Sequence, residues 1–369
     1  MVSLLLTAVL AADGDVQVPG VEPVQVVEVS DGADAVPGSL VATNDGFILA
    51  WTWRSPAASA CYLTRLTPAG HSVARVRVEA DSCEGLRAAW SGSGLGVAFQ
   101  YRVPPRIDDV PSRGGFRRYD AALAPVGPLV ELVSQPAQVG GSIVWNAKAR
   151  EWAVGWAAFS PRPGTAKLAR IAEDGTRLED VQLAPGRPLG EGWTVPLVDA
   201  LAPSGAGYVA ALSPPLRLVA FDGRAVKDVV RLDDDGHGAA LLTNDAATRV
   251  LWHARGSTVL RAAKVVGGAV KEKTLVRELS TDLGTGWPSL HCPAAPRVLW
   301  QEHQQDGTAS RLHVSGLGGK RPARVGPVDD TLGRQRFPVG LCTPQGLIVV
   351  FGRFDEVEKR DRLFLVRVP

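Results

Sequence analysis

The chain has 369 residues, of which 45% are hydrophobic and 21% are charged, and it is rich in glycine (40) and proline (27). This composition is typical of a globular protein with many turns and excludes a long disordered arm. The 40 basic and 38 acidic residues give a formal net charge of +2. The electrostatic field of so small a net charge is weak, which argues against nucleic acid or an anionic membrane surface as a partner.

The first 12 residues form an apolar segment that ends in small residues and is followed at once by Asp13-Gly14-Asp15. This pattern is typical of a secretory signal peptide cleaved near Ala11 or Ala12, although its basic start is missing. The alternative is an apolar N-terminus of a cytosolic protein. No later run approaches the roughly 20 apolar residues of a membrane helix. The sequence therefore predicts a signal peptide over 1–12, a single domain over 13–369, a secreted or periplasmic location and no membrane span.

A short β-rich run that ends in a large residue recurs along the chain. The runs are Phe47–Trp51, Leu95–Phe99, Trp152–Trp156, Tyr208–Leu212, Arg249–Trp252, Arg297–Trp300 and Leu347–Phe351. Their spacing averages about 50 residues, which indicates a repeat architecture. Each run follows another apolar strand and precedes an alternating strand that stops at a glycine turn, after which a fourth strand follows. Each repeat is therefore predicted to be a four-stranded antiparallel meander.

The seventh repeat lacks a fourth strand, because the chain ends at Pro369 directly after Arg362–Val368. The segment Val24–Val29 precedes the first repeat and has no repeat of its own. Pairing these two strands would close a ring and remove two exposed apolar edges. The alternative is an open solenoid with a frayed strand at each end.

This arrangement resembles the β-propeller superfamily over essentially the whole mature chain. The resemblance implies an all-β, seven-bladed propeller of four-stranded antiparallel blades, with the N-terminal strand joining the last blade. The signature dipeptides of the familiar blade types, such as Trp-Asp after Gly-His, are absent. The resemblance therefore implies an architecture and no particular activity.

In a propeller, the loops that enter each first strand and those that join second to third strands lie on one face, around the central channel. Ligands usually bind there. The candidate ligand-binding residues near these loops are Glu191, Trp193, Asp233, Asp235, His237, Asp282, Trp287, Arg334 and Arg336. Gly192-Trp193 and Gly286-Trp287 are interpreted as equivalent positions in two blades. Paired aromatics can stack on a sugar or an aliphatic chain, and the alternative is that they act as wedges between blades.

Three further sequence patterns are interpreted as having no binding or catalytic role. Asp233-Asp-Asp-Gly-His237 lacks the distal glutamate of a calcium loop and is interpreted as a solvated turn. Ser280–Trp287 is similar to the Asp-box of sialidase-like propellers, but it occurs once and between blades, so we interpret it as coincidental. The 6 histidines show no metal-binding spacing, and no nucleophile motif is present. The sequence predicts neither metal nor cofactor and identifies no catalytic residue.

The four cysteines fit two disulfides formed in an oxidising compartment. Cys292 lies five residues after Trp287, and Cys342 lies five residues after Phe337. They would therefore occupy equivalent positions in the innermost strands of adjacent blades, where a cross-blade disulfide is geometrically possible. Cys61 begins the third strand of the first blade, and Cys83 ends the linker after that blade. The predicted pairs are Cys61–Cys83 and Cys292–Cys342; the alternative is four reduced, buried thiols in a cytosolic protein.

A rigid ring without a catalytic constellation favours a monomeric binding or scaffold module for a protein, peptide or glycan. The alternative is a polysaccharide-directed hydrolase or lyase, in which two channel-mouth carboxylates would lie about 5 to 9 Å apart. Its candidate carboxylates are Glu191, Asp233, Asp235, Asp282, Asp329 and Asp330. A structural role in an envelope assembly is a third hypothesis. The preference for arginine over lysine is associated with a high-GC bacterial source.

Overall fold

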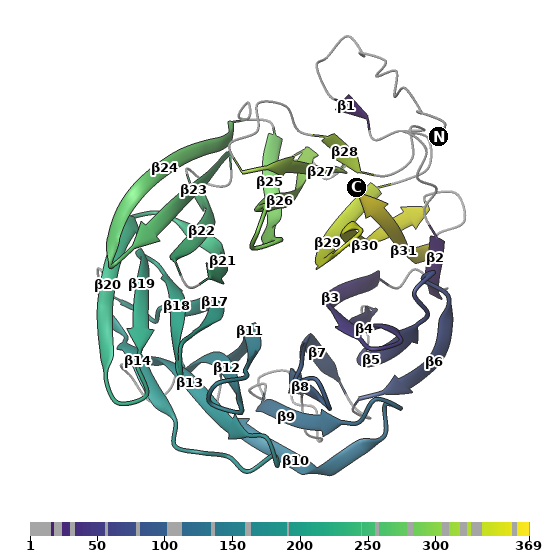
Figure 1. The fold of residues 1–369 in the computed structure, drawn as a ribbon, viewed down its shortest axis with the longest axis horizontal. Helices are drawn as coiled ribbons and strands as arrows, with labels where there is room; N and C mark the ends of the chain where they lie inside the picture. The colour runs from purple at the N-terminus through teal and green to yellow at the C-terminus, as the bar shows by residue number, and fades with distance from the viewer. Residues whose placement is uncertain are drawn as a thin grey trace.

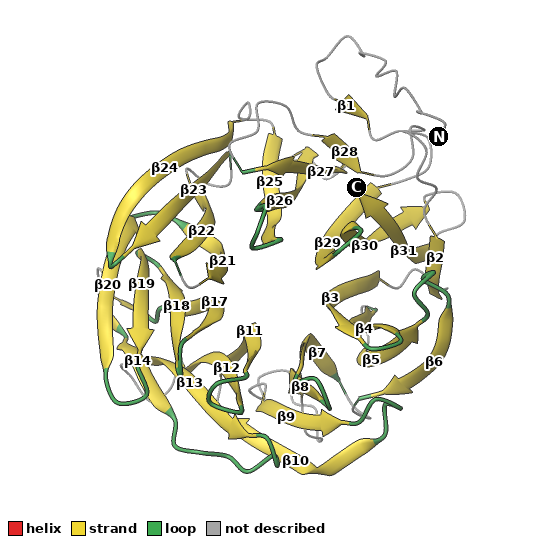
Figure 2. Ribbon diagram, in the orientation of Figure 1, coloured by secondary structure: helices red, strands yellow, loops and turns green. Residues whose placement is uncertain are grey.

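The protein folds as a ring of β-sheets. The computed structural model describes residues 16–17, 24–29, 34–55, 58–78, 82–101, 113–133, 137–158, 164–189, 192–244, 246–254, 258–278, 283–304, 310–317, 323–325, 334–355 and 360–368. In these ranges the secondary structure consists of strands without a helix (Figure 2). Seven sheets radiate around a central axis (Figure 1). The chain is a seven-bladed β-propeller, as its repeats predict. No helix in the described part of the chain is long and apolar enough to cross a membrane.

Each blade is a meander whose first strand lies nearest the axis (Figure 1). Blade one contains β3 (Asp34–Thr43), β4 (Gly46–Arg54), β5 (Ser59–Leu66) and β6 (Ser72–Arg77). Blade two contains β7 (Cys83–Trp90), β8 (Leu95–Tyr101), β9 (Arg113–Tyr119) and β10 (Pro125–Val133). Blade three contains β11 (Ala137–Asn146), β12 (Glu151–Ala158), β13 (Thr165–Ala172) and β14 (Val181–Pro185).

A small hairpin, β15 (Arg187–Leu189) and β16 (Gly192–Thr194), separates blades three and four. Blade four contains β17 (Leu197–Ser204), β18 (Gly207–Ser213), β19 (Leu216–Phe221) and β20 (Val226–Asp233). Blade five contains β21 (His237–Asn244), β22 (Ala247–Ala254), β23 (Val259–Val266) and β24 (Ala269–Glu278).

Blades six and seven both receive a strand from the N-terminal segment. Blade six contains β25 (Leu283–His291), β26 (Arg297–Gln304), β27 (Ser310–Gly316) and β28 (Ala323–Val325), with β1 (Val16–Gln17) parallel to β28 at its outer edge. Blade seven contains β29 (Arg334–Thr343), β30 (Gly346–Asp355) and β31 (Arg360–Val368), with β2 (Val24–Val29) as its outermost strand. The antiparallel pairing of β2 with β31 sets Val24 opposite Leu365, and it is the pairing predicted from the sequence. The parallel contact of β1 was not predicted.

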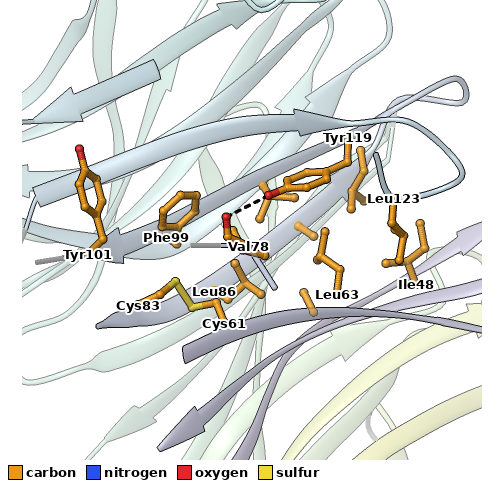
Figure 3. Packing of buried hydrophobic residues seen from close by; sticks show 14 residues of the cluster. Ile48, Cys61, Leu63, Val78, Cys83, Leu86, Phe99, Tyr101, Tyr119 and Leu123 are labelled. Carbon is orange, nitrogen blue, oxygen red and sulfur yellow. Dashed lines mark hydrogen bonds between the residues drawn. A yellow bond between two sulfur atoms is a disulfide. The ribbon is translucent and has the colours of Figure 1, made fainter. Parts of the chain in front are cut away.

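The second strand of each blade carries the hydrophobic core. Every residue of β12 and β18 is buried, because the sheets stand face to face and cover both sides of these strands. The cluster in Figure 3 joins Ile48 and Leu63 of blade one with Leu86 and Phe99 of blade two. Apolar contact between neighbouring blades thus continues around the ring, which holds the inner strands and their loops in place.

Each disulfide joins two neighbouring blades: one joins blades one and two, and the other joins blades six and seven. Cys61 of β5 is bonded to Cys83 of β7, with 5.4 Å between Cα atoms. Cys292, directly after β25, is bonded to Cys342 of β29, with 5.1 Å between Cα atoms. These are the predicted pairs, with one correction: Cys83 begins the first strand of blade two and does not end a linker, so both bonds cross between blades.

All seven innermost strands carry a β-bulge near the end at which the chain enters them. The register against the second strand shifts at Pro37/Ser39, Glu84/Arg87, Val139/Ile143, Val198/Ala200, His237/Ala240, Gly286/Ser289 and Arg336/Val339. We call the side where these strands begin the mouth face and the opposite side the far face. A bulge changes the direction of nearby side chains, and here it does so at the same level in every blade.

Candidate functional site

The predicted site residues divide into three groups. Asp233, Asp235 and His237 lie together at the turn from β20 to β21, on the mouth face, and Arg336 lies in β29. Trp193, Trp287 and Arg334 belong to β16, β25 and β29, but their side chains lie outside the described part. Glu191, Asp282, Asp329 and Asp330 fall outside the described residues.

The proposed equivalence of the two tryptophans is wrong. Trp193 lies in the β15–β16 hairpin that precedes blade four. Trp287 lies within β25, at the bulge of the innermost strand of blade six. The Gly-Trp dipeptides look alike in sequence, but Trp193 lies in an extra hairpin between two blades, whereas Trp287 lies inside a blade.

Asp233 closes the turn and is already engaged by the protein. Its Oδ1 accepts the amide N–H of Asp235 at 3.2 Å, and its Oδ2 accepts the indole N–H of Trp252 at 3.0 Å. Burial opposes ionisation of Asp233, but these hydrogen bonds outweigh it and hold its pKa below the ordinary value. Asp233 therefore positions the turn, whereas Asp235 is exposed on it.

His237 and His253 of blade five and His303 of blade six lie beside this turn. His237 faces His253 across the β21–β22 pair, with ring centroids 5.5 Å apart. Burial, followed by electrostatic interaction with His237 and His303, lowers the pKa of His253 to about 3. Gly238 has φ +60°, and a Cβ there would lie 3.0 Å from Cδ2 of His253, so glycine permits this close approach. The imidazole of His253 is thus neutral at physiological pH.

Asp199 extends the group into blade four. It stands at the bulge of β17, and its Oδ2 accepts the Ser213 hydroxyl at 2.8 Å and the Ala239 amide N–H at 3.0 Å. Burial raises the pKa of this carboxyl group despite those hydrogen bonds. The sequence analysis missed Asp199, although a single aspartate inside the apolar run Leu197-Val-Asp-Ala-Leu201 was a detectable signal.

We call Asp199, Ser213, His237, His253 and His303 the mouth cluster. It combines a partly buried carboxyl with a hydroxyl and imidazoles from blades four, five and six. Ser213 and His253 are buried, whereas His237 is exposed and His303 is partly exposed, so these last two can exchange hydrogen bonds with a polar ligand. The Ser213 hydroxyl donates to a carboxylate and not to a histidine, which is not the arrangement of an activated nucleophile. No group of three His, Cys, Asp or Glu side chains in the described ranges is arranged to hold a metal ion.

No protein-family model and no curated protein matches the sequence. Among solved structures, the chain is similar to the β-propeller domain of the trilobed protease from Pyrococcus furiosus, with a TM-score of 0.54 and 10% identity over 90% of this chain and 93% of that one. It is also similar to Pyrococcus horikoshii acylaminoacyl peptidase, with a TM-score of 0.52 and 10% identity over 90% of this chain and 51% of that one.

A third similar structure is Trypanosoma rangeli sialidase in complex with sialic acid, with a TM-score of 0.51 and 10% identity over 95% of this chain and 59% of that one. The chain thus spans about half the length of the peptidase and 59% of the sialidase. At this identity, the three likenesses show the shared propeller fold alone.

Proposed function

We propose that this protein is an exported binding module that binds a protein, peptide or glycan at its mouth face. The observation that carries the proposal is the mouth cluster, in which polar side chains from three adjacent blades lie together. Loops on a rigid scaffold are common binding sites, and convergent polar groups fix a ligand's orientation.

Export is supported by cysteine chemistry. All four cysteines are joined in two disulfides, and disulfides persist in secreted and periplasmic proteins but are rare in the reducing cytosol. The signal peptide predicted over 1–12 lies outside the described residues.

A polysaccharide-directed hydrolase or lyase is the second candidate. One observation favours it: the environments of Asp199 and Asp233 move their pKa values in opposite directions, as acid–base pairs require. Asp233, however, is held by Trp252 and its own turn. Release of new reducing ends from a polysaccharide by the wild type but not by Asp199→Asn would distinguish this candidate from simple binding.

The binding proposal predicts that photocrosslinking to a partner depends on the face of the ring. The crosslinking amino acid p-benzoylphenylalanine is placed at Asp235 on the mouth face or at Arg224 on the far face. The two sites are matched, because each is an exposed turn residue whose amide donates to the aspartate two positions earlier. With extracellular extract of the native host, we expect a discrete adduct at position 235 and none at 224. Equal labelling at both sites, or none at 235, would contradict the proposal.

A further inference from the structure

Phe337 adopts a backbone conformation that is unfavourable for an aromatic residue. It lies at the bulge of β29, with φ +56°. The corresponding bulges of blades two and five hold Gly85 and Gly238, with φ of +62° and +60°. Glycine occupies this left-handed region freely, whereas a bulky side chain there is strained. Blade seven thus places a phenylalanine where two other blades use glycine.

The hydrophobic core does not account for this strain. Phe337 is partly exposed, and it belongs to none of the hydrophobic clusters formed by the described residues. Its amide donates to Oε1 of Gln301 in blade six at 3.0 Å, and the Arg336 guanidinium lies 5.4 Å from its ring centroid. Arg336 is itself fixed by an ion pair with Asp34 of blade one at 2.6 Å. The Phe337 backbone is therefore held by blade six, and the guanidinium beside its aromatic ring is held by blade one. Local strain that the surrounding structure maintains is a feature of ligand sites.

Aromatic residues at this level occur in adjacent blades. The bulge of blade six holds Trp287, whereas the bulges of blades one, two and five hold Gly38, Gly85 and Gly238. Blade six also contributes His303 to the mouth cluster. Trp287 therefore lies in a blade that contributes to the mouth cluster and Phe337 in the blade next to it, and both bulges lie toward the mouth face.

We infer that Phe337 is a stacking position for a sugar ring and that the ligand is a glycan. The inference rests on the proposed binding function and selects one of its three ligand classes. A pyranose ring presents an apolar face to an aromatic ring and a rim of uncharged hydroxyl groups to its surroundings. Hydroxyls donate and accept hydrogen bonds, which suits the exposed imidazole of His237 and the partly exposed side chains of His303 and Asp199.

The test combines a screen with a strain-matched pair of variants. Labelled wild-type protein is applied to an oligosaccharide array and, in parallel, to a displayed peptide library. The affinity for the best oligosaccharide is then measured by calorimetry for Phe337→Gly, for Phe337→Asn as a second variant that tolerates positive φ, and for Arg150→Gly. Arg150 is the control, because it is also a non-glycine residue with positive φ (+54°) but lies in a far-face turn.

We expect both Phe337 variants to bind the oligosaccharide on the order of tenfold more weakly, with a melting temperature no lower than that of the wild type. Arg150→Gly should bind like the wild type. Unchanged affinity in the Phe337 variants would overturn the inference, as would a fall in melting temperature of roughly 5–10 °C, the mark of a lost core side chain. Binding to peptides alone would refute the glycan ligand and leave the proposed function standing. Binding to neither library would refute both.

Discussion

Deletion of residues 1–30 should lower the melting temperature by roughly 10 °C or prevent folding, whereas deletion of residues 1–22 should have a much smaller effect. The longer deletion removes β2, whose residues pair with Asp361 through Leu365 of β31. Loss of β2 leaves the backbone groups of β31 unpaired and uncovers the edge next to Leu363 and Leu365, which are buried in the core between blades seven and one. Unpaired apolar edges both destabilise a sheet and promote association.

The shorter deletion is the matched control, because it removes β1 and keeps β2. The contact of β1 with β28 involves only Val16 and Gln17. Thermal unfolding followed by circular dichroism, together with light scattering, compares the two truncations with the full chain. Equal melting temperatures for both truncations would show that β2 does not stabilise the ring.

The free energy of unfolding should fall by about 4 kcal/mol between pH 6.5 and 4.5, through His253 and His291. Burial lowers the pKa of His291 to about 4, as it lowers that of His253 to about 3. Because these folded-state values lie below the ordinary value of 6.5, the unfolded chain binds more protons in this range. Stability therefore decreases as the pH falls from 6.5 toward 4.

The groups that face each histidine modify this slope. His253 faces His237 and His303, and electrostatic interaction with both lowers its pKa in addition to burial. His291 bonds to the Ser289 hydroxyl at 2.8 Å and packs against Gly340 of the next blade. The raised pKa of Asp199 acts in the opposite sense, since the folded state then binds more protons than the unfolded one.

Urea unfolding at a series of pH values measures the effect. The double variant His253→Gln, His291→Gln should lose most of the pH dependence between 6.5 and 4.5, whatever its absolute stability. A His71→Gln variant is the control, because His71 is exposed and its replacement should leave the slope intact. A double variant with the wild-type slope would show that other groups cause the acid destabilisation.

The blades could be predicted from sequence because their second strands are covered on both sides and so appear as continuous apolar runs such as Trp152–Trp156. The ring closure followed from counting strands. The Cys292–Cys342 pair followed from equivalent positions in successive repeats, and the Cys61–Cys83 pair from a hairpin that would bring both cysteines to the same end. The β1 contact and the β15–β16 hairpin were not predictable. Each involves only two or three residues per strand, too few to show a period.

The candidate site could be predicted from the sequence only where its residues are close together along the chain. Asp233, Asp235 and His237 lie in one turn and were found from its position before a first strand. Asp199, His253 and His303 belong to β17, β22 and β26, and the ring brings these strands together although the residues are about fifty positions apart in sequence. The strain at Phe337 could not be predicted at all, because the pattern of side chains does not reveal the sign of φ.

The proposed binding function requires a ring that is exported, oxidised and rigid before it meets its ligand. The most direct test is the intact mass of the protein recovered from its native host, before and after reduction, with peptide mapping. We predict an N-terminus near Ala12, bridges Cys61–Cys83 and Cys292–Cys342, and a gain of four hydrogen atoms on reduction of the two disulfides. An uncleaved chain with four free thiols would contradict export and direct the search for a ligand to the cytosol.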